Sequence, residues 1–206
     1  MSFVRWLRLA CGLFLFAVGT VLTLRAGLGL SPWDVLADGM RRHTPLAFGE
    51  AVIAIGFALV VLTRFAGVRP GPGTIANMVL IGTFEDLLLR NGFLDGVVRA
   101  SVPLRTVTCI GGIVTIGLGS ALYIGAELGA GPRDSLMLAV AGKTRLSVGI
   151  ARALVEGAAF ISGLVLGGQW GFGTMLFAVG IGPSVDIWFR IFKMDTAGRK
   201  RRVEPA

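Results

Sequence analysis

Long apolar stretches, separated by short polar breaks, run through the whole chain. Each has about the length that an α-helix needs to cross roughly 30 Å of hydrocarbon. Five of them are Leu9–Leu24, Phe48–Leu62, Val107–Ile124, Ser147–Leu166 and Thr174–Phe189. A sixth, Thr74–Leu89, is interrupted near its end by Glu85 and Asp86. The pattern predicts six membrane-spanning helices.

Two further segments, Trp33–Met40 and Asp134–Ala141, are too short to span a bilayer. Each follows a break rich in glycine and proline, where a helix stops and another begins. We therefore expect two half-helices, and whether they are re-entrant or interfacial stays open.

The chain aligns with itself, without a gap, at an offset of one hundred residues. Gly29–Leu36 falls on Gly129–Leu136, and Gly71–Thr74 falls on Gly171–Thr174. About a quarter of the aligned positions are identical, against roughly 8 in a hundred expected from such a composition. The identities concentrate on Gly, Pro, Asp and Thr, so the apolar bias alone does not explain them. We interpret the pattern as an internal duplication.

The predicted fold is therefore an all-α membrane protein with six transmembrane helices in two repeats. Residues 1–100 form the first repeat, residues 101–195 the second, and residues 196–206 a basic tail. Each repeat holds three spans and one half-helix. Because three is odd, the second repeat is expected to enter the membrane upside down, as in many transporters.

Composition agrees with a lipid environment, since 54% of the residues are hydrophobic and only 16% are charged. One soluble core of this size does not bury so much apolar surface. The net charge of +8 includes a basic run in the tail, and such runs mark the cytoplasmic side rather than nucleic-acid binding. Both termini are expected in the cytoplasm. Arg25 ends the first apolar run without a cleavage motif, so we expect a retained span and no signal peptide.

Matched acids, Asp34 and Asp134, lie two residues after a proline in the first turn of each half-helix. An acid there caps free N–H groups and complements the helix dipole. The alternative is a solute or cation site at a broken helix, and the two roles are compatible.

Thr74 and Thr174 close matched G-x-G-T turns at the start of a span. A glycine-rich turn before a helix can hold phosphate, but no strand precedes either turn. A tight turn with threonine as the cap is therefore the favoured interpretation, and a solute contact is the alternative.

Arg152 and Glu156 lie four residues apart within the fifth span, so they share one helix face. An ionised side chain near mid-membrane costs at least ~2.5 kcal/mol unless a partner or a polar cavity offsets it. The pair is either a structural salt bridge or part of a site at the repeat interface. Asn77 is expected to face the same cavity, whereas its counterpart Phe177 is apolar.

Enzyme chemistry is not expected. The single histidine, His43, lies outside the spans, and no cluster has metal-ligand spacing. Cys11 and Cys109 both lie in apolar stretches, as small buried side chains do. The sequence predicts no cofactor and no metal site.

Several motifs resemble those of the YczE/YitT-type family of bacterial multi-pass membrane proteins. They are GLGLSPWDVL, GPGTIANMVLIG, GAGPRDSL, SVGIARALVEG, and GGQWGFGT followed by IGPSVD. Together they extend over nearly the whole chain. The resemblance implies a location in the bacterial cell (inner) membrane and a multi-pass architecture, more than it implies an activity.

The leading functional hypothesis is a small-solute permease or carrier, because the inverted repeats each contain a broken helix. The alternative is a membrane scaffold or regulatory factor that acts on a partner protein. Its glycine-rich helix faces would then serve helix–helix association with that partner. A polar cavity at the repeat interface would favour the carrier, and a fully packed interface the scaffold. The expected partners are the lipid bilayer and an unknown small solute, and homo-oligomer formation stays open.

Overall fold

The structure is a computed structural model that describes residues 3–194, and within this range all eight predicted segments are α-helices. The helices are α1 (Phe3–Ala26), α2 (Pro32–His43), α3 (Phe48–Phe65), α4 (Pro72–Arg90), α5 (Val102–Ile124), α6 (Pro132–Thr144), α7 (Val148–Val165) and α8 (Phe172–Ile191). A 3₁₀ helix, η1 (Asp95–Arg99), was not predicted. The all-α class is confirmed, and the expected basic tail lies outside the described residues.

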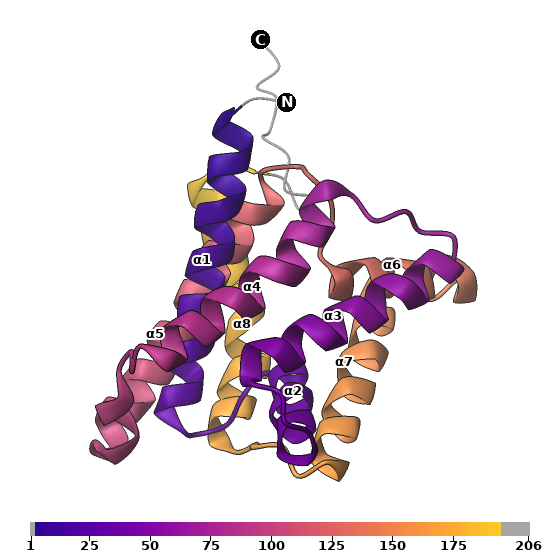
Figure 1. Ribbon diagram of the computed structural model, residues 1–206. Coiled ribbons are helices and arrows are strands. Elements are labelled where there is room, and N and C mark those ends of the chain that lie inside the picture. Colours follow the sequence, from indigo (N-terminus) through magenta and orange to yellow (C-terminus); the bar gives the residue numbers. More distant parts are fainter. Residues whose placement is uncertain (1–2, 195–206) are drawn as a thin grey trace.

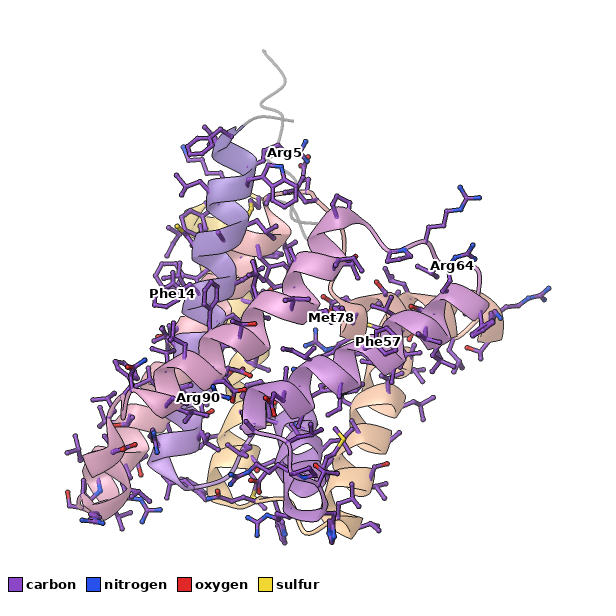
Figure 2. The ribbon with its side chains drawn as sticks, viewed as in Figure 1. Arg5, Phe14, Phe57, Arg64, Met78 and Arg90 are labelled. Atoms are coloured by element: carbon purple, nitrogen blue, oxygen red, sulfur yellow. The ribbon has the colours of Figure 1, made fainter. Side chains whose placement is uncertain are left out.

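Five of the described helices, α1, α3, α5, α7 and α8, are long and apolar enough to cross a membrane. The sixth expected span, α4, has 19 residues but is not among them. Its polar residues Asn77, Glu85 and Asp86 lower its mean hydropathy. Many large apolar side chains are exposed, as on a lipid-facing surface, and Phe14 and Phe57 are among them (Figure 2).

The helix boundaries repeat along the chain. Each of α5–α8 begins and ends within two residues of the position expected from α1–α4 at the hundred-residue offset. Proline stands in the first turn of α2, α4, α5 and α6, where its fixed φ suits a helix start and its missing N–H leaves nothing unpaired. Ser31 and Ser147 cap α2 and α7 with their hydroxyl oxygens.

The first helices of the two repeats, α1 and α5, pack against each other along most of their length (Figure 1). Gly12 lies against the backbone of Gly119, and Gly19 lies against Gly112, with no room for a Cβ at any of the four. The earlier of these glycines in α1 contacts the later one in α5, and the later one in α1 contacts the earlier one in α5, so the two helices are antiparallel. Such glycine contacts allow close backbone approach in membrane helices.

Reciprocal hydrogen bonds relate the two repeats. Arg5 donates to the carbonyl oxygens of Ala126 and Glu127, and its counterpart Arg105 donates to those of Ala26 and Gly27. Likewise, Gly73 N–H donates to Leu128 O at 2.8 Å, and Gly173 N–H donates to Leu28 O at 2.7 Å. Each repeat therefore anchors the loop that precedes the half-helix of the other.

The last two helices of the repeats are packed differently. In the first repeat, Gly49 of α3 and Gly82 of α4 are in backbone contact. Asp86 accepts hydrogen bonds from Gly49 N–H at 2.7 Å and Glu50 N–H at 3.1 Å, so it caps α3, while Arg90 pairs with Glu50. Asp86 of α4 thus fixes the start of α3 against α4.

In the second repeat, α7 and α8 diverge from the turn that joins them (Figure 1). At Gly149 and Gly182, the counterparts of Gly49 and Gly82, no atom beyond the chain neighbours and the helix's own backbone lies within 4 Å of the position that a Cβ would take. Asp186, the counterpart of Asp86, is exposed. The same residues therefore form a closed helix pair in one repeat and an open pair in the other.

Asp38 connects α2, which is too short to span a bilayer, to the turn between α7 and α8. Its buried carboxylate accepts hydrogen bonds from Arg41 at 2.7 Å, from Arg42 at 2.9 Å and from Gln169 N–H at 2.8 Å. Burial alone would raise the pKa of Asp38, but these hydrogen bonds and the charge of Arg41 together hold the pKa below its ordinary value. The half-helix is thereby fixed to the opposite repeat.

Candidate functional site

A cavity of about 160 Å³ lies between the two repeats. Each of the helices α1–α8 contributes at least one residue to its wall. The lining includes Phe16, Ser31, Trp33, Val52, Asn77, Met78, Ser120, Tyr123, Arg133, Asp134, Arg152, Glu156, Phe177 and Ile181. Met78 lies against Gly56 of α3, where α3 and α4 come close to each other (Figure 2). The cavity thus combines an apolar frame with polar and charged groups.

The first turns of the two half-helices meet at this cavity. The Arg133 guanidinium lies over the ring of Trp33, 5.4 Å from its centroid, although the two residues occupy equivalent positions in the repeats. Its Nη2 is also 3.5 Å from Oδ1 of Asp34. Each half-helix therefore presents its N-terminal end to the space between the repeats, and one arginine connects the two ends.

The two matched aspartates have different partners. Asp34 is only 2% exposed and accepts a hydrogen bond from the Ser31 hydroxyl at 2.5 Å. Its N–H donates to the Ser31 oxygen at 3.3 Å, which is a helix-capping arrangement. Asp134 lines the cavity and accepts a hydrogen bond from the Tyr123 hydroxyl at 2.9 Å. Asp134 is part of the cavity wall. Asp34 is not, but it pairs with Arg133, which is.

Arg152 and Glu156 form a hydrogen-bonded salt bridge, with Nε and Oε1 2.8 Å apart. Their side chains are 55% and 33% exposed, and both line the cavity. Asn77 of α4 also lines the cavity, with its amide next to Gly131. The structure therefore brings four of the predicted site residues to one cavity, namely Asn77, Asp134, Arg152 and Glu156.

The two threonines have no place in the cavity wall. Gly71 N–H donates to the Thr74 hydroxyl at 3.1 Å, and Gly171 N–H donates to the Thr174 hydroxyl at 3.2 Å. The Thr74 hydroxyl donates in turn to Ala130 O at 2.6 Å. These contacts match the tight-turn interpretation of the G-x-G-T motifs, with each turn packed against the loop of the other repeat.

The sequence pattern alone did not identify two residues of this region, Arg133 and Glu85. Arg133 was not singled out, although a cation beside the proline of a half-helix differs from its counterpart Trp33. Glu85 lies near the end of its span in the sequence, yet it is 1% exposed and its counterpart is Val185. The sequence does contain a signal for Glu85. An acid stands in a span where the other repeat has an aliphatic residue, and such acids are costly in a membrane.

Comparisons with known proteins agree with the membrane architecture. A family model described as a family of unknown function, DUF6198, matches residues 3–190, so the chain belongs to this family. Among its relatives is the uncharacterised membrane protein YczE of Bacillus subtilis, which is 36% identical over 178 residues, 85% of this chain and 81% of that protein.

Two further relatives are similar over most of their length. An uncharacterised protein of Haemophilus influenzae is 33% identical over 181 residues, 87% of this chain and 80% of that protein. The uncharacterised protein YyaS of Bacillus subtilis is 25% identical over 204 residues, 97% of this chain and 99% of that protein. No solved structure matches the chain. The predicted resemblance to YczE-type proteins is confirmed, and the protein is a membrane protein.

Proposed function

For this member of the DUF6198 family, we propose a role as a carrier of a small polar solute, with the substrate site in the cavity between the repeats. The observation that carries the proposal is the cavity itself, because a scaffold with a fully packed interface would leave no such space. Binding sites of membrane carriers lie at repeat interfaces, where broken helices present their ends to the substrate.

The size and the wall of the cavity indicate the class of solute. An apolar cavity of about 150 Å³ in another protein holds one benzene molecule, so a solute of roughly six to eight non-hydrogen atoms fits here. Two cations, Arg133 and Arg152, and two acids, Asp134 and Glu156, face this space. A compact solute that carries both a positive and a negative group therefore matches the wall best.

The proposal includes the six-span inverted architecture. The antiparallel packing of α1 and α5 supports it, since equivalent helices then run in opposite directions. The ends of the described chain also lie together, because Arg8 of α1 is 6.0 Å from the ring centroid of Phe192, after α8. For α4 to be the sixth span, its acids must face protein, and both Glu85 and Asp86 do so.

The difference between the two repeats supports an alternating mechanism. A carrier must open its site to each side of the membrane in turn. Here α3 and α4 are closed at Gly49 and Gly82, and α7 and α8 are open at Gly149 and Gly182. Under the predicted orientation, the open pair faces the cytoplasm. In the second state we expect the two repeats to exchange these arrangements.

The topology can be tested directly. In a variant without Cys11 and Cys109, cysteines introduced by Ser2→Cys and Glu204→Cys should react only with reagents that reach the cytoplasm. Both ends then lie on the same side, as an even number of spans requires. Labelling of either position from outside intact cells would contradict the inverted arrangement. A cysteine in the loop at residues 167–171 provides the positive control for outside labelling.

The carrier function predicts distinct behaviour for the Arg152–Glu156 pair. Proteoliposomes with the purified protein should take up a member of a panel of small zwitterionic metabolites. Glu156→Gln should fold and insert normally but reduce uptake at least tenfold, and Arg152→Gln/Glu156→Gln should not restore it, because the solute would need both charges. Glu50→Gln, which alters a surface pair with Arg90, is the matched control and should keep uptake.

A purely structural salt bridge gives the opposite pattern. Removing one partner leaves a charge without its counterion, whereas removing both restores neutrality. Lower thermal stability in both single variants, with recovery in the double variant, would therefore contradict a solute-binding role for this pair. Uptake that no variant at the cavity changes would contradict the location of the site.

A further inference from the structure

Beside the cavity, the protein interior holds more acids than cations. Glu85 and Asp34 are 1% and 2% exposed. The Arg133 guanidinium pairs with Asp34, and its positive charge also acts on Glu85. Arg133 lies 3.5 Å from Asp34 Oδ1. One arginine balances one carboxylate, so a second ionised carboxylate in this cluster would leave an unpaired buried charge.

No other group among the described residues supplies the missing charge. Asp86, next to Glu85, adds a further acid, and its carboxylate is occupied by the N–H groups that begin α3. From α3, Glu50 pairs with Arg90 at the surface. From α1, the side chain that faces Glu85 is Thr20, which is uncharged, and Arg25 is paired with Asp95 of η1.

The polar atoms of this cluster are also incompletely paired. Within residues 3–194, Oε2 of Glu85 and Oγ1 of Thr20 are buried without a hydrogen-bond partner. A protonated carboxyl gains a donor, and a threonine hydroxyl can accept from it. Two neighbouring oxygens are too few for a metal cation, since Ca²⁺ and Mg²⁺ take six or more ligands.

From this charge balance and geometry, we propose that Glu85 is a proton-binding site, filled in the conformation described here and controlled by the Arg133–Asp34 pair. The inference goes beyond the carrier proposal, because it concerns the charge of the interior and needs no solute. Since Arg133 also lines the cavity, a movement of its guanidinium toward Glu85 would release the proton.

Infrared spectroscopy of the purified protein provides the test, because a protonated carboxyl and an ionised carboxylate absorb in separate C=O bands. At neutral pH the wild type should show a protonated-carboxyl band that disappears in Glu85→Gln. Glu156→Gln is the matched control and should keep the band, since Glu156 lies outside this cluster and forms a salt bridge with Arg152.

A second variant, Asp34→Asn, tests whether the charge balance with Arg133 keeps Glu85 protonated. Asp34→Asn keeps Glu85 but frees Arg133 to neutralise it, so the protonated band should again disappear at neutral pH. A band that persists in folded Glu85→Gln, or one that persists in Asp34→Asn, would overturn the proposal. Loss of the band on addition of sodium chloride would also overturn it, in favour of a cation site. None of these results depends on whether a solute is transported.

Discussion

Gly82→Ala is expected to lower the free energy of unfolding by about 1–3 kcal/mol, the usual cost of overpacking a tight contact. A Cβ at this position would collide with the backbone carbonyl of Gly49, and a backbone neighbour cannot turn aside as a side chain can. The same change at Gly182 should leave stability within about 0.5 kcal/mol, because the position is open. Thermal or denaturant unfolding of both variants in the same detergent measures the difference.

The pair of variants is well matched, since both replace glycine by alanine at equivalent positions of equivalent helices. If carriers of this kind alternate by exchanging the two arrangements, Gly182→Ala should nevertheless reduce uptake, because it blocks closure of α7 against α8. A stable Gly182→Ala variant with full uptake would contradict the exchange. Equal destabilisation by the two substitutions would contradict the described difference between the repeats.

The two glycine pairs also show what sequence reasoning cannot reach. Gly49 and Gly149 are identical, and so are Gly82 and Gly182, so the local sequence does not say which pair is in contact. The contact depends on the tilt of whole helices, which is decided by packing over many residues. Glycine at both positions of the open pair is still informative, because a closed contact leaves no room for a Cβ.

The helices themselves could be predicted, because lipid imposes a simple rule on the chain. Apolar stretches of suitable length between glycine and proline breaks become helices, and all eight predicted segments are helical. The half-helices are longer than predicted by one to three residues at each end, since polar residues such as Arg42 and Lys143 continue a helix at its exposed end. Helix α1 likewise extends back to Phe3, because Arg5 binds the carbonyl groups of the loop after α5.

The candidate site was only partly predictable. Arg152 and Glu156 could be placed on one helix face from their spacing, and their position in a span marked them as unusual. The partnership of Arg133 with Trp33 and Asp34 depends on two half-helices meeting end to end. That arrangement arises from the reciprocal loop anchors, so it is not encoded in the spacing of the residues that take part.

Arg133→Gln is expected to be the most destabilising single change at the repeat interface, at about 3–5 kcal/mol, the cost of leaving a buried charge without its partner. Asp34 is buried and would keep only the Ser31 hydroxyl as a side-chain partner. Arg133→Lys should cost less than Arg133→Gln, because it preserves the charge but loses the planar contact with the ring of Trp33. The free energy of unfolding in detergent measures each effect, and Arg99→Gln, at an exposed position, is the control.

The double variant Asp34→Asn/Arg133→Gln decides whether this loss comes from the ion pair. Removing both charges leaves no unpaired carboxylate at position 34, so most of the stability lost in Arg133→Gln should return. The part of the stability that does not return measures the lost stacking of Arg133 on Trp33. We expect it to be about 0.5–2 kcal/mol, the usual contribution of a cation–π contact. A double variant as unstable as Arg133→Gln alone would mean that the arginine holds the half-helix ends together through its stem and ring contact, and that its pairing with Asp34 contributes little.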